Sequence, residues 1–178
     1  ALDPIKPEDL EKRDFYQSMI WTSKGIIRYA NRYAQAADEL AETERDPVRA
    51  TELRAIAQNC RKVPEYPPES FYEAIQFLWF VQVCGILSEN PLSLNPGRFD
   101  QDMDPYYEAD VAKVAITQDF AQELVDALWL KYSEWVWTIS ANTADSFAGY
   151  NQFQNLTVGG KKRDGKDGTN PVTFMALK

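Results

Sequence analysis

The sequence predicts an α/β protein that is mostly helical over its 178 residues. Long stretches place apolar residues at steps of three, four or seven, which is the spacing of one helix face. Several of these stretches follow a residue that commonly caps a helix, namely Asp46, Ser70, Thr117 or Asn170. One run, Phe153 to Gly160, alternates as a strand does. No repeat, low-complexity tract or flexible linker divides the chain, so we expect one piece over residues 1–178.

The first two predicted helices run from Pro7 to about Glu44 and from Pro47 to just before Pro64. Asp46 and Pro47 supply an N-cap and a first helical residue, which together mark the second start. The first helix is expected to bury one stripe of residues: Phe15, Met19, Ile26, Ala30, Tyr33, Ala37 and Leu40.

The third predicted helix follows Ser70 and is apolar almost all round, so it should be buried on most sides. A shorter helix is expected around Pro105 to Ala115. Thr117 then caps a long fourth helix. Its expected core-facing stripe is Phe120, Leu124, Leu128, Tyr132, Trp135 and Ile139.

The remaining chain changes character after Ser140. Residues 142–152 are polar and are expected to be irregular, and the strand over 153–160 is followed by Asp-Gly turns. Asn170 and Pro171 begin a helix that has little more than two turns before Lys178. Because so short a helix is marginal without a partner, we expect the sequence to be an excised piece of a longer protein.

Composition excludes several function classes. The formal charge of −8 argues against binding a nucleic-acid backbone, and the absence of histidine removes Ser-His-Asp and Cys-His mechanisms and the common zinc sites. Cys60 and Cys84 are expected to be reduced core residues. We find no signal peptide and no run of about 18 apolar residues, so a cytoplasmic protein without a membrane partner is expected.

The irregular stretch from Asn90 to Gln101 is the main candidate for function, although it could also be a simple connection. Ser93 has no neighbouring base, so it would hydrogen-bond a ligand or act as a local turn hydroxyl. Arg98 would either clamp a carboxylate or tie the loop to nearby carbonyl groups.

Three alternating acids, Asp100, Asp102 and Asp104, allow two interpretations. They could bind a hard cation, but Pro105 and Val111 stand where an EF-hand loop needs glycine and glutamate. Acids at a helix N-terminus, complementing its dipole, are the favoured interpretation. The basic cluster 161–163 and the segment 165–168 are interpreted as solvated turns.

Several segments together resemble the glycyl radical enzymes of the pyruvate formate-lyase-like group. They are Val-Pro-Glu-Tyr-Pro-Pro-Glu-Ser-Phe-Tyr-Glu-Ala-Ile-Gln-Phe-Leu-Trp-Phe (63–80), Pro-Gly-Arg-Phe-Asp-Gln (96–101), Pro-Tyr-Tyr (105–107), Ala-Gly-Tyr (148–150) and Phe-Gln-Asn-Leu-Thr-Val-Gly-Gly (153–160). The order and spacing of these segments cover most of the chain. The resemblance implies a middle fragment of a ten-stranded α/β barrel wrapped by helices.

The resemblance also implies chemistry that lies outside residues 1–178. The family stores a radical on a glycine near its C-terminus and uses a cysteine in a Cys-x-Glu loop, and neither context is present here. We therefore expect no catalytic residue and no bound cofactor or metal in this chain. The implied partners are the rest of the same catalytic subunit, further copies in a homo-oligomer and the radical SAM activating enzyme that installs the glycyl radical. The resemblance also allows for a small iron–sulfur subunit.

Glycerol and diol dehydratases of the family have a His-Ser pair just upstream of the motif at 96–101, and the matching positions here are Leu92 and Ser93. The absence of the histidine argues against a polyol substrate, because a desolvated, hydroxyl-rich ligand needs paired donors and acceptors. The resemblance is greatest to arylacetate decarboxylases such as 4-hydroxyphenylacetate decarboxylase, and it assigns substrate binding to Ser93 and Phe153, at the carboxylate and the ring respectively. The alternatives are a dehydratase, a choline-type C–N lyase, a sulfonate C–S lyase or a formate acetyltransferase-like enzyme. From another class, the alternative is a non-catalytic helical interaction domain.

Overall fold

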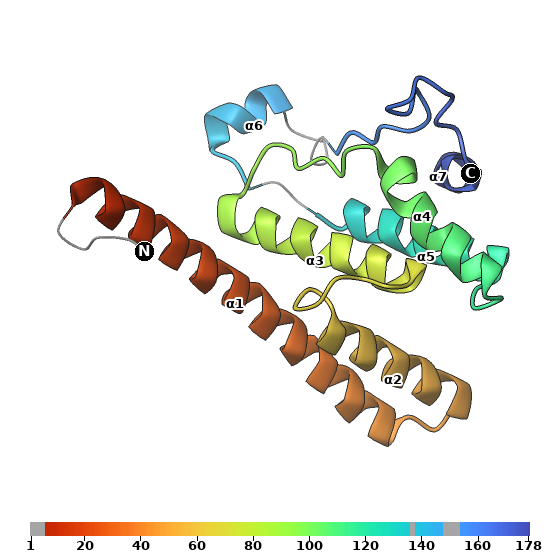
Figure 1. Ribbon diagram of the computed structural model, residues 1–178. Helices are drawn as coiled ribbons and strands as arrows, with labels where there is room; N and C mark the ends of the chain where they lie inside the picture. Colours follow the sequence, from red (N-terminus) through yellow and green to blue (C-terminus); the bar gives the residue numbers. More distant parts are fainter. Residues whose placement is uncertain (1–5, 136–137, 148–153) are drawn as a thin grey trace. The chain divides into compact units, whose positions relative to one another are not determined.

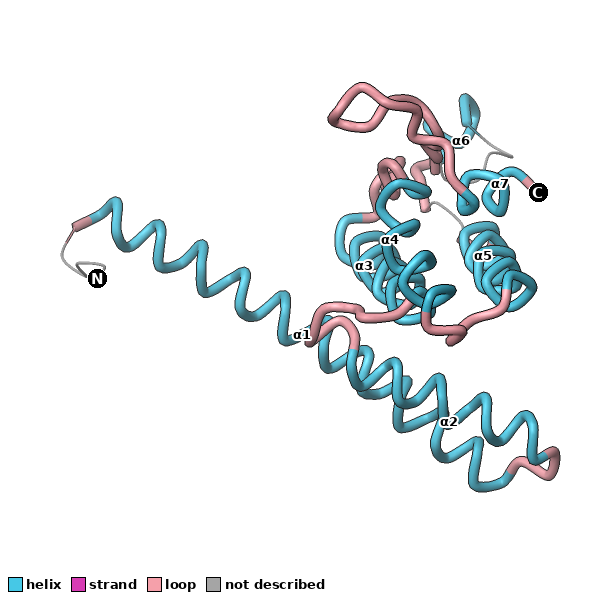
Figure 2. The backbone as a smooth tube through the Cα atoms, turned by 45° about the vertical axis from the view of Figure 1, so that its right-hand side comes forward, coloured by secondary structure: helices cyan, strands magenta, loops and turns pink. Residues whose placement is uncertain are grey.

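The computed structural model describes residues 6–135, 138–147 and 154–178 (Figure 1). In these ranges the chain forms seven helices joined by turns and loops, and it contains isolated β-bridges but no strand (Figure 2). It divides into two compact units, Ala1–Tyr66 and Pro67–Lys178. The boundary falls between Tyr66 and Pro67, in a proline-containing segment that begins with a turn over residues 63–65. The expectation of one family piece over residues 1–178 stays a prediction.

The first unit is a helical hairpin of α1 (Pro7–Thr43) and α2 (Pro47–Lys62). The predicted cap is present, because the Asp46 carboxylate accepts a hydrogen bond from the Val48 backbone N–H at 2.9 Å. The predicted stripe is confirmed for Ala30 and Ala37 but is wrong for its large side chains, since Phe15 and Leu40 are about 60% exposed. The buried residues of α1 are small instead, which lets two backbones approach closely: Ala30, Ala34, Ala37 and Ala41.

The second unit contains α3 (Phe71–Glu89), α4 (Phe99–Ala112), α5 (Gln118–Ser133), α6 (Ala141–Phe147) and α7 (Pro171–Leu177). Helix α4 contacts α3 and α7, and α5 contacts the same two helices. Both views show these four helices packed as one group (Figures 1 and 2). Their shared core is Phe71, Ile75, Phe99, Tyr107, Ala121, Leu124, Val125, Leu128, Val172 and Met175.

Helix starts in this unit are fixed by side chains. The Ser70 and Thr117 hydroxyl oxygens each accept a bond from a backbone N–H three residues ahead, both at 3.2 Å. Asn170 and Thr173 form a reciprocal capping box. A further contact was not predicted: the buried Asp110 carboxylate accepts a bond from the Phe71 N–H at 2.8 Å. The three caps predicted for this unit, Ser70, Thr117 and Asn170, are therefore confirmed.

Two helix boundaries differ from the prediction. Helix α4 begins at Phe99 and carries Pro105 in its interior, because the buried Phe99 and Asp100 hold its first turn in place. Helix α5 ends at Ser133, before the predicted Ile139. Thr138 cannot continue that helix, since its backbone N–H and C=O both pair with the Asn90 side chain.

The predicted strand is also reduced. In the described part of 153–160, Thr157 forms a single parallel bridge with Arg98. A strand needs a neighbour that pairs over several residues, and the backbone beside Thr157 offers only the short stretch before α4. The prediction that residues 142–152 are irregular is wrong for the first part of that range, because Ala141–Phe147 forms helix α6.

Helix α3 corrects the expectation that no segment could cross a bilayer. An 18-residue window of this 19-residue helix has a mean hydropathy of 1.3, so by length and composition it is the one described helix that could do so. A core helix passes the same test. Here Ser70 caps α3, Asp110 binds its first N–H, and Gln82 is 2% exposed within it, which fits a core helix.

Candidate functional site

The loop from Asn90 to Gln101 leaves the end of α3 and enters α4 (Figure 1). Asn90 adopts the left-handed conformation, with φ of 43°, that ends many helices. Its amide also donates to the Thr138 carbonyl oxygen at 2.7 Å. The start of the loop is therefore fixed to the chain that follows α5.

The middle of the loop lies against α3. The buried Gln82 amide donates to the Leu94 carbonyl oxygen at 2.7 Å. A Cβ atom at Gly85 would stand only 2.7 Å from Leu94 Cδ2, so the glycine leaves the room that the leucine occupies. The residues on either side of Leu94 are thereby held at a fixed distance from the helix.

Ser93 and Asn95 are joined by a hydrogen bond within this loop. The Ser93 Oγ lies 2.8 Å from Asn95 Oδ1, and the Asn155 backbone nitrogen lies 2.7 Å from the same oxygen. A backbone N–H can only donate, so the Asn95 atom between them is an acceptor. Ser93 must then donate its one hydrogen to Asn95, and its lone pairs remain available to accept.

Arg98 ties the loop to a distant segment. Its guanidinium Nη1 donates to the Lys161 carbonyl oxygen at 3.3 Å, and the Thr157 N–H donates to the Gly97 carbonyl oxygen at 3.3 Å. Arg98 itself is exposed. These contacts agree with the anchoring interpretation of Arg98 rather than with a carboxylate clamp.

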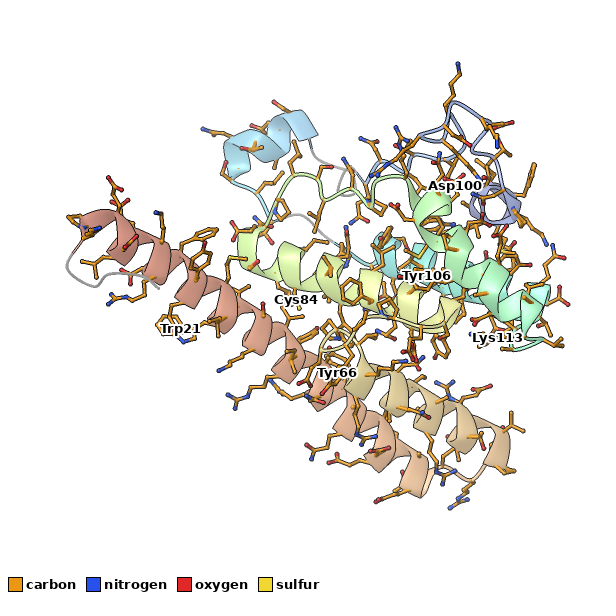
Figure 3. The ribbon with its side chains drawn as sticks, viewed as in Figure 1. Trp21, Tyr66, Cys84, Asp100, Tyr106 and Lys113 are labelled. Atoms are coloured by element: carbon orange, nitrogen blue, oxygen red, sulfur yellow. The ribbon has the colours of Figure 1, made fainter. Side chains whose placement is uncertain are left out.

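Asp100 and Gln101 complete the anchorage (Figure 3 labels Asp100). The fully buried Asp100 Oδ2 accepts from the Gly159 N–H at 2.6 Å and from the Thr173 hydroxyl. The Gln101 amide donates to the Gly159 carbonyl oxygen at 2.6 Å. Gly168 is required nearby, because a Cβ there would meet that carbonyl oxygen at 3.0 Å.

The three alternating acids have different surroundings. Asp100 and Asp104 are buried, whereas Asp102 is exposed. Burial raises the pKa of Asp104 above its ordinary value, the charges of Glu108 and Asp100 raise it further, and Lys162 opposes them. Among the residues that the structure describes, no group of three or more acids, histidines or cysteines is placed to hold a metal ion.

The two predicted substrate-binding residues are not brought together within the described residues. Ser93 is half-buried on the loop, and Leu92 before it is 42% exposed. Phe153 lies outside the described residues. Asn95 was not predicted as a functional residue.

Comparison with known proteins decides the family. The model of the pyruvate formate lyase-like family matches residues 1–178. This chain belongs to that family. The predicted family resemblance is confirmed over the whole sequence.

Several pyruvate formate lyase-like proteins are similar in sequence. Isethionate sulfite-lyase from Nitratidesulfovibrio vulgaris is 38% identical over 181 residues, covering 100% of this chain and 22% of that protein. Indoleacetate decarboxylase from Tractidigestivibacter scatoligenes is 39% identical over 150 residues, covering 84% of this chain and 17% of that protein. The chain therefore spans only about a fifth of the length of these relatives.

Two solved structures support the same family. The structure described for 1,2-propanediol dehydration in Roseburia inulinivorans matches with a TM-score of 0.95 and 43% identity, covering 98% of this chain and 22% of that one. The glycerol-bound glycerol dehydratase from Clostridium butyricum matches with a TM-score of 0.90 and 42% identity, covering 97% and 22%. At these identities the likeness extends beyond the fold, but neither match singles out the decarboxylase subgroup.

Both cysteines of this pyruvate formate lyase-like chain lie in helices. Cys60 in α2 is 3% exposed, and burial raises the pKa of its thiol to about 11. Cys84 in α3 (Figure 3) is half-buried, and burial raises its pKa as well. Because the thiolate is the reactive form, these surroundings suit packing rather than catalysis.

Proposed function

We propose that residues 1–178 are an internal segment of a longer glycyl radical lyase that removes water or sulfite from a small hydroxylated substrate. The observation that carries this proposal is the similarity along the whole chain to a sulfite-lyase and to structures named for diol and glycerol dehydration. Two of the predicted alternatives, a dehydratase and a sulfonate C–S lyase, thereby take the place of arylacetate decarboxylation as the first candidate, because these similarities support them as well or better.

The loop geometry supports a hydroxylated substrate. Ser93 donates to Asn95 and can only accept from a ligand, so its natural partner is a group that carries a hydrogen. A substrate hydroxyl provides that hydrogen, whereas an ionised carboxylate does not. In this proposal Ser93 binds and orients the substrate, and the anchors on α3, α4 and the 155–159 segment hold it in place.

The reaction itself belongs to other parts of the parent protein. In this proposal the family's stored glycyl radical supplies hydrogen-atom abstraction through a cysteine outside residues 1–178. A ten-stranded barrel, a cytoplasmic homo-oligomer and a radical SAM activating enzyme are parts of the same proposal. This segment contributes helices of the barrel wall and one side of the substrate pocket.

Decarboxylation of an arylacetate is the second candidate. It rests on the 39% identity to indoleacetate decarboxylase, which is as high as the identity to the sulfite-lyase but extends over 84% of the chain. In that case Ser93 would turn its hydrogen to the substrate carboxylate, and Phe153 would pack on the aromatic ring. Such a protein could also require the small iron–sulfur subunit.

An anaerobic assay of the activated full-length parent separates the two candidates. The substrate panel is isethionate, glycerol, 1,2-propanediol, choline, 4-hydroxyphenylacetate and indoleacetate. Release of sulfite or water from one of the first three supports the proposal. Turnover of an arylacetate alone establishes the second candidate instead, and turnover of choline alone refutes both.

A Ser93→Ala variant tests the binding role. Loss of one hydrogen bond to the substrate should raise KM by about tenfold, while the unfolding free energy changes by less than about 1 kcal/mol. Unchanged kinetics with lower stability would make Ser93 a turn residue only. Ser88→Ala, at an exposed hydroxyl near the end of α3, is the matched control.

A further inference from the structure

We propose that Asn95 is a specificity-determining positioning residue: it makes Ser93 an obligate acceptor and so selects substrates that present a hydroxyl. The inference rests on the proposed function and names the residue that enforces its substrate class. Asn95 acts through Ser93 and is not itself placed as a substrate ligand.

The first step is the identity of the Asn95 atom. The oxygen and nitrogen of an asparagine amide are distinguished only by their partners. Here the Asn155 backbone N–H, 2.7 Å away, requires an acceptor. The same atom therefore accepts from Ser93 at 2.8 Å. If the amide were reversed, its NH₂ group would face the Asn155 N–H, and two donors would meet.

The second step is the fixed position of Asn95. Its neighbour Leu94 is held to α3 by Gln82, and Pro96 restricts the Asn95 backbone to extended conformations. Beyond them, Gly97 accepts from the Thr157 N–H at 3.3 Å. Although Asn95 is exposed among the described residues, its backbone is therefore anchored on both sides.

The third step is the consequence for a ligand. To donate to a carboxylate or an ether, Ser93 must leave Asn95 and give up an existing hydrogen bond. To accept from a hydroxyl, it changes nothing. A protein that keeps this pair therefore favours a hydroxyl over an otherwise similar group that only accepts.

The test uses the activated full-length parent and the hydroxylated substrate found in the panel above: isethionate, glycerol or 1,2-propanediol. Its O-methyl ether, which accepts but cannot donate at that position, is measured as a competitive inhibitor. We expect the wild type to bind the ether about tenfold or more weakly than the substrate, as expected for one mismatched hydrogen bond.

The variants separate positioning from structure. Asn95→Leu has a similar size and frees the Ser93 hydrogen, so discrimination against the ether should fall to about threefold or less. Asn95→Asp keeps both acceptor contacts and should retain discrimination. In a Ser93→Ala background, Asn95→Leu should change discrimination no further. The proposal would be overturned if Asn95→Leu and Asn95→Asp lost discrimination against the ether equally. It would also be overturned if Asn95→Leu reduced discrimination as much in the Ser93→Ala background as in the wild type.

Hydrogen exchange at the Asn155 amide gives a readout without turnover. In the substrate-free parent, Asn95→Leu should speed this exchange and Asn95→Asp should not; equal exchange in both variants counts against the pairing. Wild-type turnover of an arylacetate alone overturns the proposed function together with this inference. Turnover of a hydroxylated substrate with unchanged discrimination in Asn95→Leu overturns this inference alone.

Discussion

The carboxylate of Asp100 in α4 accepts a hydrogen bond from the hydroxyl of Thr173 in α7, across 73 residues of sequence. The same oxygen accepts from the Gly159 N–H, and the other oxygen accepts from the Gln101 N–H at 2.8 Å. One fully buried side chain thus connects two helices and the segment between them. The position of the loop from Asn90 to Arg98, which leads into α4, depends on this connection.

Replacing Asp100 with alanine should destabilise the second unit by about 3 kcal/mol or more, because the buried Thr173 hydroxyl and the partly buried Gly159 N–H lose their acceptor. Denaturant unfolding of the 178-residue chain, followed by tryptophan fluorescence in a Trp21→Phe background, reports on this unit, since the other tryptophans lie in it. The exposed Asp102→Ala change, in the same turn, should cost less than about 1 kcal/mol. Similar losses in both variants would refute the role of Asp100.

Asp104 should make the second unit less stable as pH rises. Its folded-state pKa is raised by burial and by Glu108 and Asp100, so the folded chain binds this proton more tightly than the unfolded chain. Stability is therefore lost as pH increases from the ordinary value of 3.8 through the raised folded value, and it is not regained above it.

An Asp104→Asn variant should remove this dependence and increase stability at pH 7 by about 1 kcal/mol, because Oδ1 has no hydrogen-bond partner within the described residues. Below pH 3.8 the two proteins should be similar in stability. Unfolding free energies measured from pH 3 to pH 7 provide the check. A variant that is less stable than the wild type at pH 7 contradicts this account.

Alkylation should distinguish the two cysteines. With a pKa of about 11, the Cys60 thiol has about a hundredfold less thiolate at pH 8 than an unperturbed cysteine, and it is also 3% exposed. Cys84 is half-buried and should react with iodoacetamide sooner. Mass spectrometry of peptides from the native chain measures both rates, and unfolded chain provides the reference. Equal native rates would show that burial does not protect Cys60.

Replacing Gly25 with alanine should stabilise α1 locally by about 0.5–1 kcal/mol, since glycine is unfavourable inside a helix. An added Cβ there meets no atom within 4 Å. Hydrogen exchange of the surrounding amides should slow accordingly. Gly168→Ala is the opposite case, because its Cβ would press on the Gly159 carbonyl oxygen, and exchange near Gly159 should become faster. Faster exchange around residue 25 would disprove the first expectation.

Helix starts were predictable because a cap is a local interaction. Asp46, Ser70 and Thr117 bind backbone N–H groups two or three residues ahead, so their chemistry is visible in the sequence. The start of α4 was missed because it depends on the long-range bonds of Asp100. Pro105 suggested a later start, since proline is common in a first turn, but burial of Phe99 outweighs that local preference.

The site was predictable only in part for the same reason. Ser93 was predicted as a substrate-binding residue through resemblance to the family, and the loop that carries it was singled out by its proline and glycine residues; both assignments stay predictions. The partner that defines its hydrogen-bonding state lies elsewhere, because Asn95 meets Asn155 across 60 residues. Pattern within a short window contains no information on such a pair.

The segment from Gly160 to Gly168 is a loop whose two ends lie beside each other. Gly168 donates its N–H to the Gly160 carbonyl oxygen at 2.7 Å, and Lys161 pairs with Asp167 just beyond. Extra residues near Arg163 would lengthen a closed loop whose base stays unchanged, and doubling such a loop costs only about 0.6 kcal/mol of closure entropy. A purification tag or a fluorescent label inserted there should leave the contacts of Gly159 with α4 in place. The turn therefore offers an attachment point for reporting on the loop from Asn90 to Arg98 from outside.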